Sequence, residues 1–256
     1  MKNEITAFSL DKNMKRIFLG DNIGNIKCFN MKNGKLLKNL TIHNAEINIL
    51  IHSLKLNVLI SCSVDNIIKL HRDADIVDSQ LLKELFLINN KIKSLLVMDD
   101  YARIIIGLSN GAIRFYDIEH YRYDSDLFSD ANVFNDELTS MYYFNNKCIL
   151  LTSHSSGLNK LLICPPHPMK FISILEFYNK DLKDEKNNIP VTCFDFDEST
   201  NMLFCGDQLG YISCYSLKEF FKTIETSGLN DNSKIFNNFN QMVFSIFFLT
   251  IINFQL

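Results

Sequence analysis

The sequence predicts an all-β protein built from five four-stranded units. Five similar segments in the 256 residues begin with an apolar residue, as a strand would: Ile5, Ile47, Ile92, Leu138 and Val191. Nineteen residues after each start stands a turn-forming Gly or Asn: Gly24, Asn66, Gly111, Gly157 and Gly210. The starts are 42, 45, 46 and 53 residues apart. Constant spacing within a unit and variable spacing between units is typical of strands joined by tolerant loops.

Within a unit, the elements follow in a fixed order. The starting segment predicts the first strand, and a short apolar run 12 to 14 residues later predicts a second strand buried on both faces. That run always ends in a small residue, which we expect to be crowded by neighbours: Gly20, Cys62, Gly107, Ser153 and Gly206. After the turn residue, apolar and polar positions alternate, as in Ile26, Lys27 and Cys28, which predicts a third strand.

The turn residue has a physical reason to be Gly or Asn. A tight turn between antiparallel strands needs a positive φ, which is easy for Gly and tolerable for Asn. Asn66 should therefore cost the second unit less than the ~1–2 kcal/mol that ordinary residues lose in a left-handed conformation.

A unit of about 40–45 residues with four strands is typical of a β-propeller blade. The alternative, a β-sandwich of hairpins, does not explain one internal offset kept through five units. We call the units blades 1 to 5. Because five blades are recognisable and the first strand starts at Ile5, we expect an incomplete or open ring.

Two segments resemble the second strand, turn and third strand of the WD40-repeat family. Residues 18–29 read FLGDNIGNIKCF and residues 204–215 read FCGDQLGYISCY. His43, four residues before Ile47, lies where the family places its Gly-His histidine. The resemblance covers roughly residues 4–225 and implies a β-propeller. The phrase around Gly206 is also similar to WD40 proteins associated with cilia and flagella, some of which carry EF-hands. The chain has no Asp-x-Asp-x-Asp-Gly calcium loop, so no EF-hand carries over.

The Trp-Asp pair of the family is missing, and the chain has no Trp. The corresponding sites hold Phe29-Asn30, His71-Arg72, Tyr116-Asp117, Leu162-Ile163 and Tyr215-Ser216. In the family, this Trp joins a buried hydrogen-bond network with a Ser or Thr, the Asp and the His. We expect that network to be intact in no blade. Blade stability should then come mostly from apolar burial, at ~25 cal/mol per Å².

The predicted domain organisation is a propeller over residues 1–235 and an apolar tail over residues 236–256. Three interpretations of the segment 242–256 stay open: a strand of a partial sixth blade, a spurious terminus, and a membrane tail anchor. Val243 follows Val191 by 52 residues, which favours the sixth blade. The apolar stretch is short for a span of ~20 residues.

Two loops break the repeat. Residues 117–136 mix acidic and aromatic side chains, which fits either a fourth strand with a solvated loop or a protein-binding site. Residues 179–188 are mostly charged and read as a flexible surface insertion.

Composition excludes several classes of function. A net charge of −3 gives no electrostatic basis for binding nucleic acid or an anionic membrane. Seven Cys residues without a CxxC pair or a signal peptide indicate reduced thiols in a cytoplasmic protein.

The search for chemistry yields weak candidates, so we assign no catalytic, cofactor-binding or metal-binding residue. The phosphate-loop, dinucleotide, nucleophile-elbow and zinc-protease motifs are absent. His154 stands between two hydroxyl side chains, Ser153 and Ser155. Because successive side chains in a strand point to opposite faces, the imidazole points away from both hydroxyls. Cys164 and His167 lack the second pair of a closed zinc site. His52 and His71 read as structural.

The second residue of each first strand helps to distinguish a protein-binding scaffold from an enzyme or small-ligand binder. These residues are Thr6, Asn48, Lys93, Thr139 and Thr192. They include no acidic or His cluster for acid–base work. We therefore expect a non-enzymatic scaffold that binds other proteins in a larger assembly, cytoskeletal or axonemal, in the cytoplasm. The alternative is a propeller enzyme or small-ligand binder that uses the channel mouth.

Overall fold

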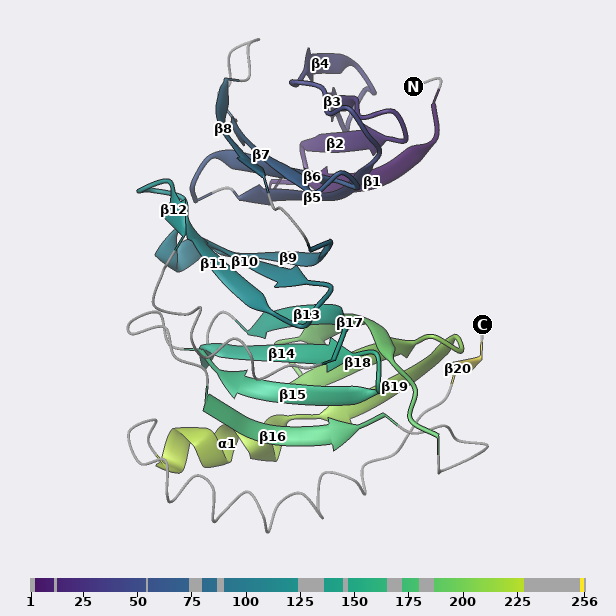
Figure 1. Cartoon of the computed structure of the whole chain (residues 1–256), viewed down its shortest axis with the longest axis vertical. Coiled ribbons are helices and arrows are strands. Elements are labelled where there is room, and N and C mark those ends of the chain that lie inside the picture. The colour runs from purple at the N-terminus through teal and green to yellow at the C-terminus, as the bar shows by residue number, and fades with distance from the viewer. Residues whose placement is uncertain are drawn as a thin grey trace. The chain divides into compact units, whose positions relative to one another are not determined.

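The computed structural model describes residues 3–11, 13–53, 55–73, 80–86, 90–123, 136–144, 147–164, 172–179, 187–227 and 254–255 (Figure 1). In this part of the chain the strands form five four-stranded antiparallel sheets. Each sheet contains four strands that are consecutive in the sequence, so none of them combines strands from the two ends of the chain. The five predicted blades are therefore confirmed as five sheets.

The chain divides into two compact units. The first holds blades 1 to 3, apart from the turn at residues 110–112. Blade 1 consists of β1 (Ile5–Leu10), β2 (Arg16–Asp21), β3 (Ile26–Asn30) and β4 (Leu36–Asn39). Blade 2 consists of β5 (Ile47–Ser53), β6 (Val58–Ser63), β7 (Ile67–Arg72) and β8 (Leu81–Phe86). Blade 3 consists of β9 (Ile92–Met98), β10 (Arg103–Leu108), β11 (Ile113–Asp117) and β12 (Arg122–Tyr123), with a short 3-10 turn at Asp99–Tyr101.

The second unit holds blades 4 and 5. Blade 4 consists of β13 (Leu138–Phe144), β14 (Ile149–His154), β15 (Leu158–Ile163) and β16 (Ile172–Tyr178). Blade 5 consists of β17 (Val191–Asp197), β18 (Met202–Asp207), β19 (Tyr211–Ser216) and β20 (Phe254–Gln255), and helix α1 (Lys218–Ser227) follows β19. All five first strands begin at the residues that the repeat predicted.

The turns follow the repeat at two positions in each blade. The predicted turn residues all have positive φ, from 65° at Asn66 to 91° at Gly24. A second series with φ between 50° and 55° lies in the turn between the first and second strands: Met14, Asn57, Ala102, Cys148 and Asn201. This second series was not identified from the sequence, because only Asn57 and Asn201 among its members are residue types that tolerate positive φ. The blades thus share a common backbone path through both turns.

The predicted crowding at the end of the second strand occurs at Gly20 and Gly206. A Cβ at Gly20 would lie 2.7 Å from the Ile47 side chain of the next blade. A Cβ at Gly206 would lie 2.6 Å from the Cys193 sulfur of its own blade. Gly20 is therefore crowded by the next blade, whereas Gly206 is crowded by its own blade.

Helix α1 departs from the all-β expectation. Leu217, Phe220 and Phe221 are buried in one cluster with side chains of blades 4 and 5. Their spacing of three and four residues places them on one face of a helix, and this face packs against the sheets. Apolar burial therefore favours a helix here over a strand that continues the repeat.

The apolar tail is described only at its end. Phe254 and Gln255 pair with Ile212 and Tyr211 and form the fourth strand of blade 5. Residues 228–253, including the proposed strand at Val243, lie outside the described residues, so the division at residue 235 stays a prediction. In the loop at 117–136, Arg122–Tyr123 forms the expected fourth strand of blade 3, and residues 124–135 lie outside the described part. Of the charged insertion, residues 180–186 also lie outside it.

Candidate functional site

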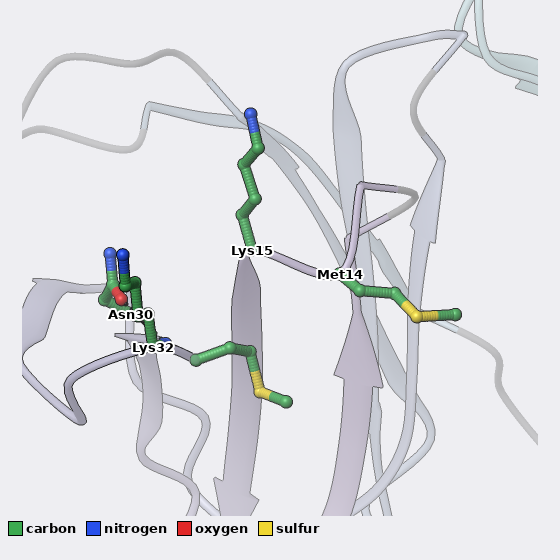
Figure 2. Close-up of a pocket in the computed structure, with 5 residues that line it drawn as sticks. Met14, Lys15, Asn30 and Lys32 are labelled. Carbon is green, nitrogen blue, oxygen red and sulfur yellow. Dashed lines mark hydrogen bonds between the residues drawn. The ribbon is translucent and has the colours of Figure 1, made fainter.

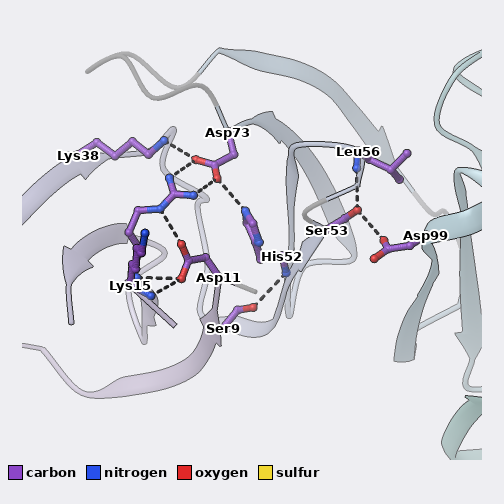
Figure 3. A network of polar contacts seen from close by, with 10 residues as sticks. Ser9, Asp11, Lys15, Lys38, His52, Ser53, Leu56, Asp73 and Asp99 are labelled. Carbon is purple, nitrogen blue, oxygen red and sulfur yellow. Dashed lines mark hydrogen bonds and ion pairs between the residues drawn. The ribbon is translucent and has the colours of Figure 1, made fainter. Parts of the chain in front are cut away.

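A buried cluster of charged side chains joins blades 1 and 2, and Asp73 lies at its centre (Figure 3). Arg16 donates two hydrogen bonds to the Asp73 carboxylate, at 2.9 and 2.7 Å. The Lys38 ammonium donates at 2.6 Å and His52 Nε2 at 2.7 Å. The carboxylate side chain is 3% exposed. Blade 1 thus supplies two cations, and blade 2 supplies the carboxylate and the imidazole.

A second carboxylate balances the charge of this cluster. Asp11 accepts a hydrogen bond from Arg16 Nε at 3.1 Å and from the backbone N–H groups of Lys15 and Arg16 at 2.7 and 2.9 Å. Two carboxylates and two cations therefore compensate each other when His52 is neutral. Burial raises the pKa of Asp73, but the hydrogen bonds from His52, Lys38 and Arg16 lower it more, so the pKa lies well below its usual range.

Three contacts fix the position of His52. A carboxylate can only accept, so the Nε2 atom of His52 carries a proton. The ring stacks on Phe18 of blade 1, with centroids 5.2 Å apart and planes 15° apart. The backbone N–H of His52 donates to the Ser9 hydroxyl at 3.0 Å. These contacts occupy His52 in joining the blades, as its structural interpretation predicted.

Blade 2 contains a variant of the network that we expected to be absent. The Ser61 hydroxyl lies 2.7 Å from His43 Nε2 and 3.2 Å from His71 Nε2. His71 occupies the site of the missing Trp, and all three side chains are buried. The network of the family, with its Trp and Asp, is not intact in blade 2, and His43, Ser61 and His71 form a variant of it that was not anticipated from the sequence. The positions of His43 and Ser61 match those of the family's network, so the sequence contained the signal. It was missed because the imidazole of His71 was not considered as a polar substitute for the indole of the Trp.

Both imidazoles of this network are neutral at pH 7. Burial, with the nearby Lys69 ammonium, lowers the pKa of His43 to about 4. Burial, with the charges of His43 and Lys69, lowers the pKa of His71 to about 3. Their Nδ1 atoms are buried without a hydrogen-bond partner among the described residues. Adding a proton to either ring would place a charge in an apolar interior.

The other candidates from the sequence are engaged in the framework or lie outside it. The Ser153 hydroxyl accepts a hydrogen bond from the Val191 N–H at 3.3 Å, and His154 contacts Thr152 and the backbone of Asp136. Burial raises the pKa of the Cys164 thiol to about 12, and residues 165–171, which include His167, lie outside the described residues. Within the described ranges, no group of three or more metal-ligating side chains occurs.

Two of the five second residues join one blade to the next. Thr6 donates to the carbonyl of Ile47 at 2.6 Å, and Thr139 donates to the carbonyl of Val191 at 2.7 Å. Each acceptor is the first residue of the following blade. These hydroxyls therefore serve the blade junctions.

The described surface has a hollow in each compact unit. One of about 460 Å³ lies beside two turns of blade 1 and is lined by Met14, Lys15, Asn30, Met31 and Lys32 (Figure 2). The other, of about 300 Å³, is lined by Phe144, Lys147, Phe196, Glu198 and Asn201. Met14 is 71% exposed and Met31 47%. Exposed methionines are typical of surfaces that adapt to a protein partner.

The fold of this chain is similar to that of proteins with solved structures. No family model matches the sequence. The chain is similar to the β-propeller domain of Cps50 (Swd1) from Myceliophteria thermophila, with a TM-score of 0.67 at 10% identity over 83% of this chain and 69% of that one. The chain has a β-propeller fold. It is also similar to the computationally designed Ika8 protein, with a TM-score of 0.60 at 20% identity over 85% of this chain and 59% of that one.

One curated protein adds a biological context. The chain is 25% identical over 280 aligned residues to cilia- and flagella-associated protein 337 B of Tetrahymena thermophila. The match covers 91% of this chain and 22% of that protein. The chain therefore spans about a fifth of the relative's length. Among the described residues, no helix has the length and apolar character to cross a membrane.

Proposed function

We propose that this propeller is a non-catalytic scaffold that binds other proteins within a larger axonemal or cytoskeletal assembly in the cytoplasm. The observation that carries the proposal is the use of the polar side chains. Arg16, Lys38 and His52 of two blades share the Asp73 carboxylate. Thr6 and Thr139 donate hydrogen bonds to the backbone of the next blade. Polar side chains that bond one blade to the next stabilise a framework, and the loops of this framework are available to bind partners.

Two further observations support this function. The hollow beside blade 1 is lined by two exposed methionines, a residue type enriched at protein interfaces. The similarity to a protein named for cilia and flagella supports an axonemal place for the partner. For the tail, we propose that Val243 begins a partial sixth blade before the chain returns to blade 5 at Phe254 and Gln255.

Co-sedimentation with purified axonemes tests the proposal. We expect the chain to pellet with Tetrahymena axonemes in a saturable manner and to stay in solution without them. A variant with Met14→Asp and Met31→Asp should bind more weakly, whereas Ile23→Asp, an exposed apolar position outside the hollow, should bind normally. A chain that stays in the supernatant at all axoneme concentrations would contradict the axonemal role. Stabilisation by one member of a metabolite library in a thermal-shift screen would favour the small-ligand alternative.

A further inference from the structure

The junction between blades 1 and 2 shows how this repeat packs. Blade 1 contributes a forward face, defined here as the five residues Thr6, Phe18, Gly20, Ile26 and Cys28. Ile47, the first residue of blade 2, packs on Gly20 and accepts the Thr6 hydrogen bond on its carbonyl. Phe18, Ile26 and Cys28 share one buried cluster with three residues of blade 2, namely Ile47, Leu50 and Leu59. We call these three positions the back face of a blade.

Blade 5 repeats the forward face of blade 1 with the same residue types. Each residue lies 186 positions later: Thr192, Phe204, Gly206, Ile212 and Cys214. The strand register is also the same, because Cys193 pairs with Gly206 as Ala7 pairs with Gly20. Phe18 is 0% exposed, whereas Phe204 is 38% exposed. Thr192 is exposed, and its hydroxyl donates to Gly206 of its own blade instead of to a following one.

Blade 1 exposes the complementary surface. The three back-face positions are 0%, 7% and 0% exposed in blade 2, and 5%, 4% and 0% exposed at Ile92, Leu95 and Ile104 of blade 3. In blade 1 they are Ile5, Phe8 and Ile17. Ile5 is 50% exposed, Phe8 is 65% exposed and Ile17 is partly buried. Within the described part of the chain, blade 5 therefore exposes part of a forward face and blade 1 part of a back face. These are the two halves of the junction that blades 1 and 2 form.

We propose that the forward face of blade 5 binds the back face of blade 1 of a second copy of this chain, head to tail. In this contact Ile5 packs on Gly206, and the Thr192 hydroxyl turns from Gly206 to the carbonyl of Ile5. Phe8 and Phe204 become buried, as Leu50 and Phe18 are in the internal junction. The apolar area removed from water drives the association. Such a contact is heterologous, so it extends beyond a dimer unless the geometry closes a ring.

A solved β-propeller supports a blade as the occupant. This chain covers 69% of the Cps50 β-propeller domain, so that propeller is larger than the part that these five blades match. The residues on both uncovered faces are those that pack against a blade within this chain, which favours a second copy over an unrelated partner.

Two complementary variants test the proposal by sedimentation velocity over a range of protein concentrations. Wild-type protein should show a mass that rises above one chain as concentration increases. Phe8→Lys removes the back face and Phe204→Lys removes the forward face, so each variant alone should sediment as a single chain. An equimolar mixture retains one intact pair of faces and should form a 1:1 dimer, with twice the mass of either variant and no further growth.

A third variant, with a substitution outside both faces, is the control. Phe86→Lys changes a residue of β8 that is 62% exposed and belongs to neither face, so its assembly should match wild type. A wild-type monomer at all concentrations, assembly by either single variant, or a mixture that stays monomeric would each overturn the proposal.

A measurement on the unmodified protein guards against misfolded variants. Cys193 is exposed and occupies the position of Ala7 beside the forward face. Its alkylation should slow several-fold between dilute and concentrated protein. A rate that does not depend on protein concentration would contradict the association, and slow alkylation even in dilute protein would indicate cover from within the chain.

Discussion

At the scale of single residues, the His43–Ser61–His71 network replaces an indole-based arrangement with two imidazoles. Hydrogen bonds to Ser61 satisfy one nitrogen of each ring, and the interior keeps both rings neutral. The substitution preserves a buried polar contact between strands β6 and β7 and the loop that precedes β5. It also introduces groups that titrate near neutral pH in the unfolded chain.

These histidines predict an acid-sensitive fold. In the unfolded chain a His binds its proton near pH 6.5, whereas His43 and His71 bind theirs only at about 4 and 3 in the native state. The unfolded state therefore holds more protons between these values, and the free energy of unfolding falls as pH drops below about 6.5. The slope should reach about 1.4 kcal/mol per pH unit for each ring. Urea unfolding at several pH values between 4.5 and 7.5 measures it.

A matched variant isolates the contribution of one ring. His71→Phe removes one titrating group and places an aromatic residue where blade 1 has Phe29. In this variant the slope of the unfolding free energy against pH should fall by about 1.4 kcal/mol per pH unit, which is the contribution of one bound proton. Equal slopes for the variant and the wild type would contradict the assignment of His71 as a buried neutral ring.

At the scale of elements, an apolar contact and a polar cluster join blade 1 to blade 2. The apolar contact places Ile47 of β5 on Gly20 of β2, and the polar cluster places Asp73 among cations of β2 and β4. Both contacts connect residues that are far apart in the sequence. They decide how firmly one blade holds the next.

Removing Asp73 should be strongly destabilising. Asp73→Ala leaves Arg16, Lys38 and His52 buried without their shared acceptor, and uncompensated buried charge costs about 3–5 kcal/mol. Asp100→Ala is the control, because Asp100 pairs with Lys55 at the surface, where both side chains are about half exposed. That change should cost less than about 1 kcal/mol. Chemical denaturation that finds equal effects for the two variants would contradict the role of the cluster.

The crowding at Gly20 predicts a second effect on the same junction. In Gly20→Ala the new Cβ meets the Ile47 side chain, including its own Cβ at 2.8 Å, so blade 2 must shift. We expect a loss of about 1–3 kcal/mol in unfolding free energy. Gly206→Ala, at the same position of blade 5, meets only the sulfur of Cys193, which can rotate away. Its cost should be smaller, and a cost as large as that of Gly20→Ala would mean that the next blade is not what limits the space.

At the scale of the whole molecule, the seven cysteines report on packing. Cys28, Cys62, Cys164 and Cys205 are buried, Cys148 and Cys214 are half-buried, and Cys193 is exposed. Burial raises the pKa of Cys28 to about 11 and that of Cys62 to about 12, so their reactive thiolate forms are scarce. The thiols are free in all seven, as the composition predicted.

Thiol labelling of dilute native protein should therefore show one fast-reacting group. With Ellman's reagent at pH 8, we expect Cys193 to react first and all seven thiols to react after denaturation. Cys193→Ser should remove the fast phase and leave the slow phases unchanged. Several fast thiols in the native protein would mean that the blade interiors are open to the reagent.

The sequence alone predicted much of the fold. The constant offset of 19 residues located all five first strands, the turn residues and the third strands, because strand alternation and turn handedness are properties of short stretches of backbone. It also marked Gly20 and Gly206 as crowded positions. It missed the turn series that includes Met14 and Ala102, since these two residue types rarely adopt positive φ and carry no signal for it.

The sequence by itself determined the repeat, the strands and the side chains that each blade buries, because local periodicity expresses these properties. The tertiary structure decided which polar groups meet. Arg16 and Asp73 lie 57 residues apart and come together only when blade 2 packs on blade 1. Helix α1 likewise depends on an apolar surface formed by two blades, against which Phe220 and Phe221 pack. Partners of buried charges and docking faces are chosen by contacts between elements, and the pattern within one element does not contain them.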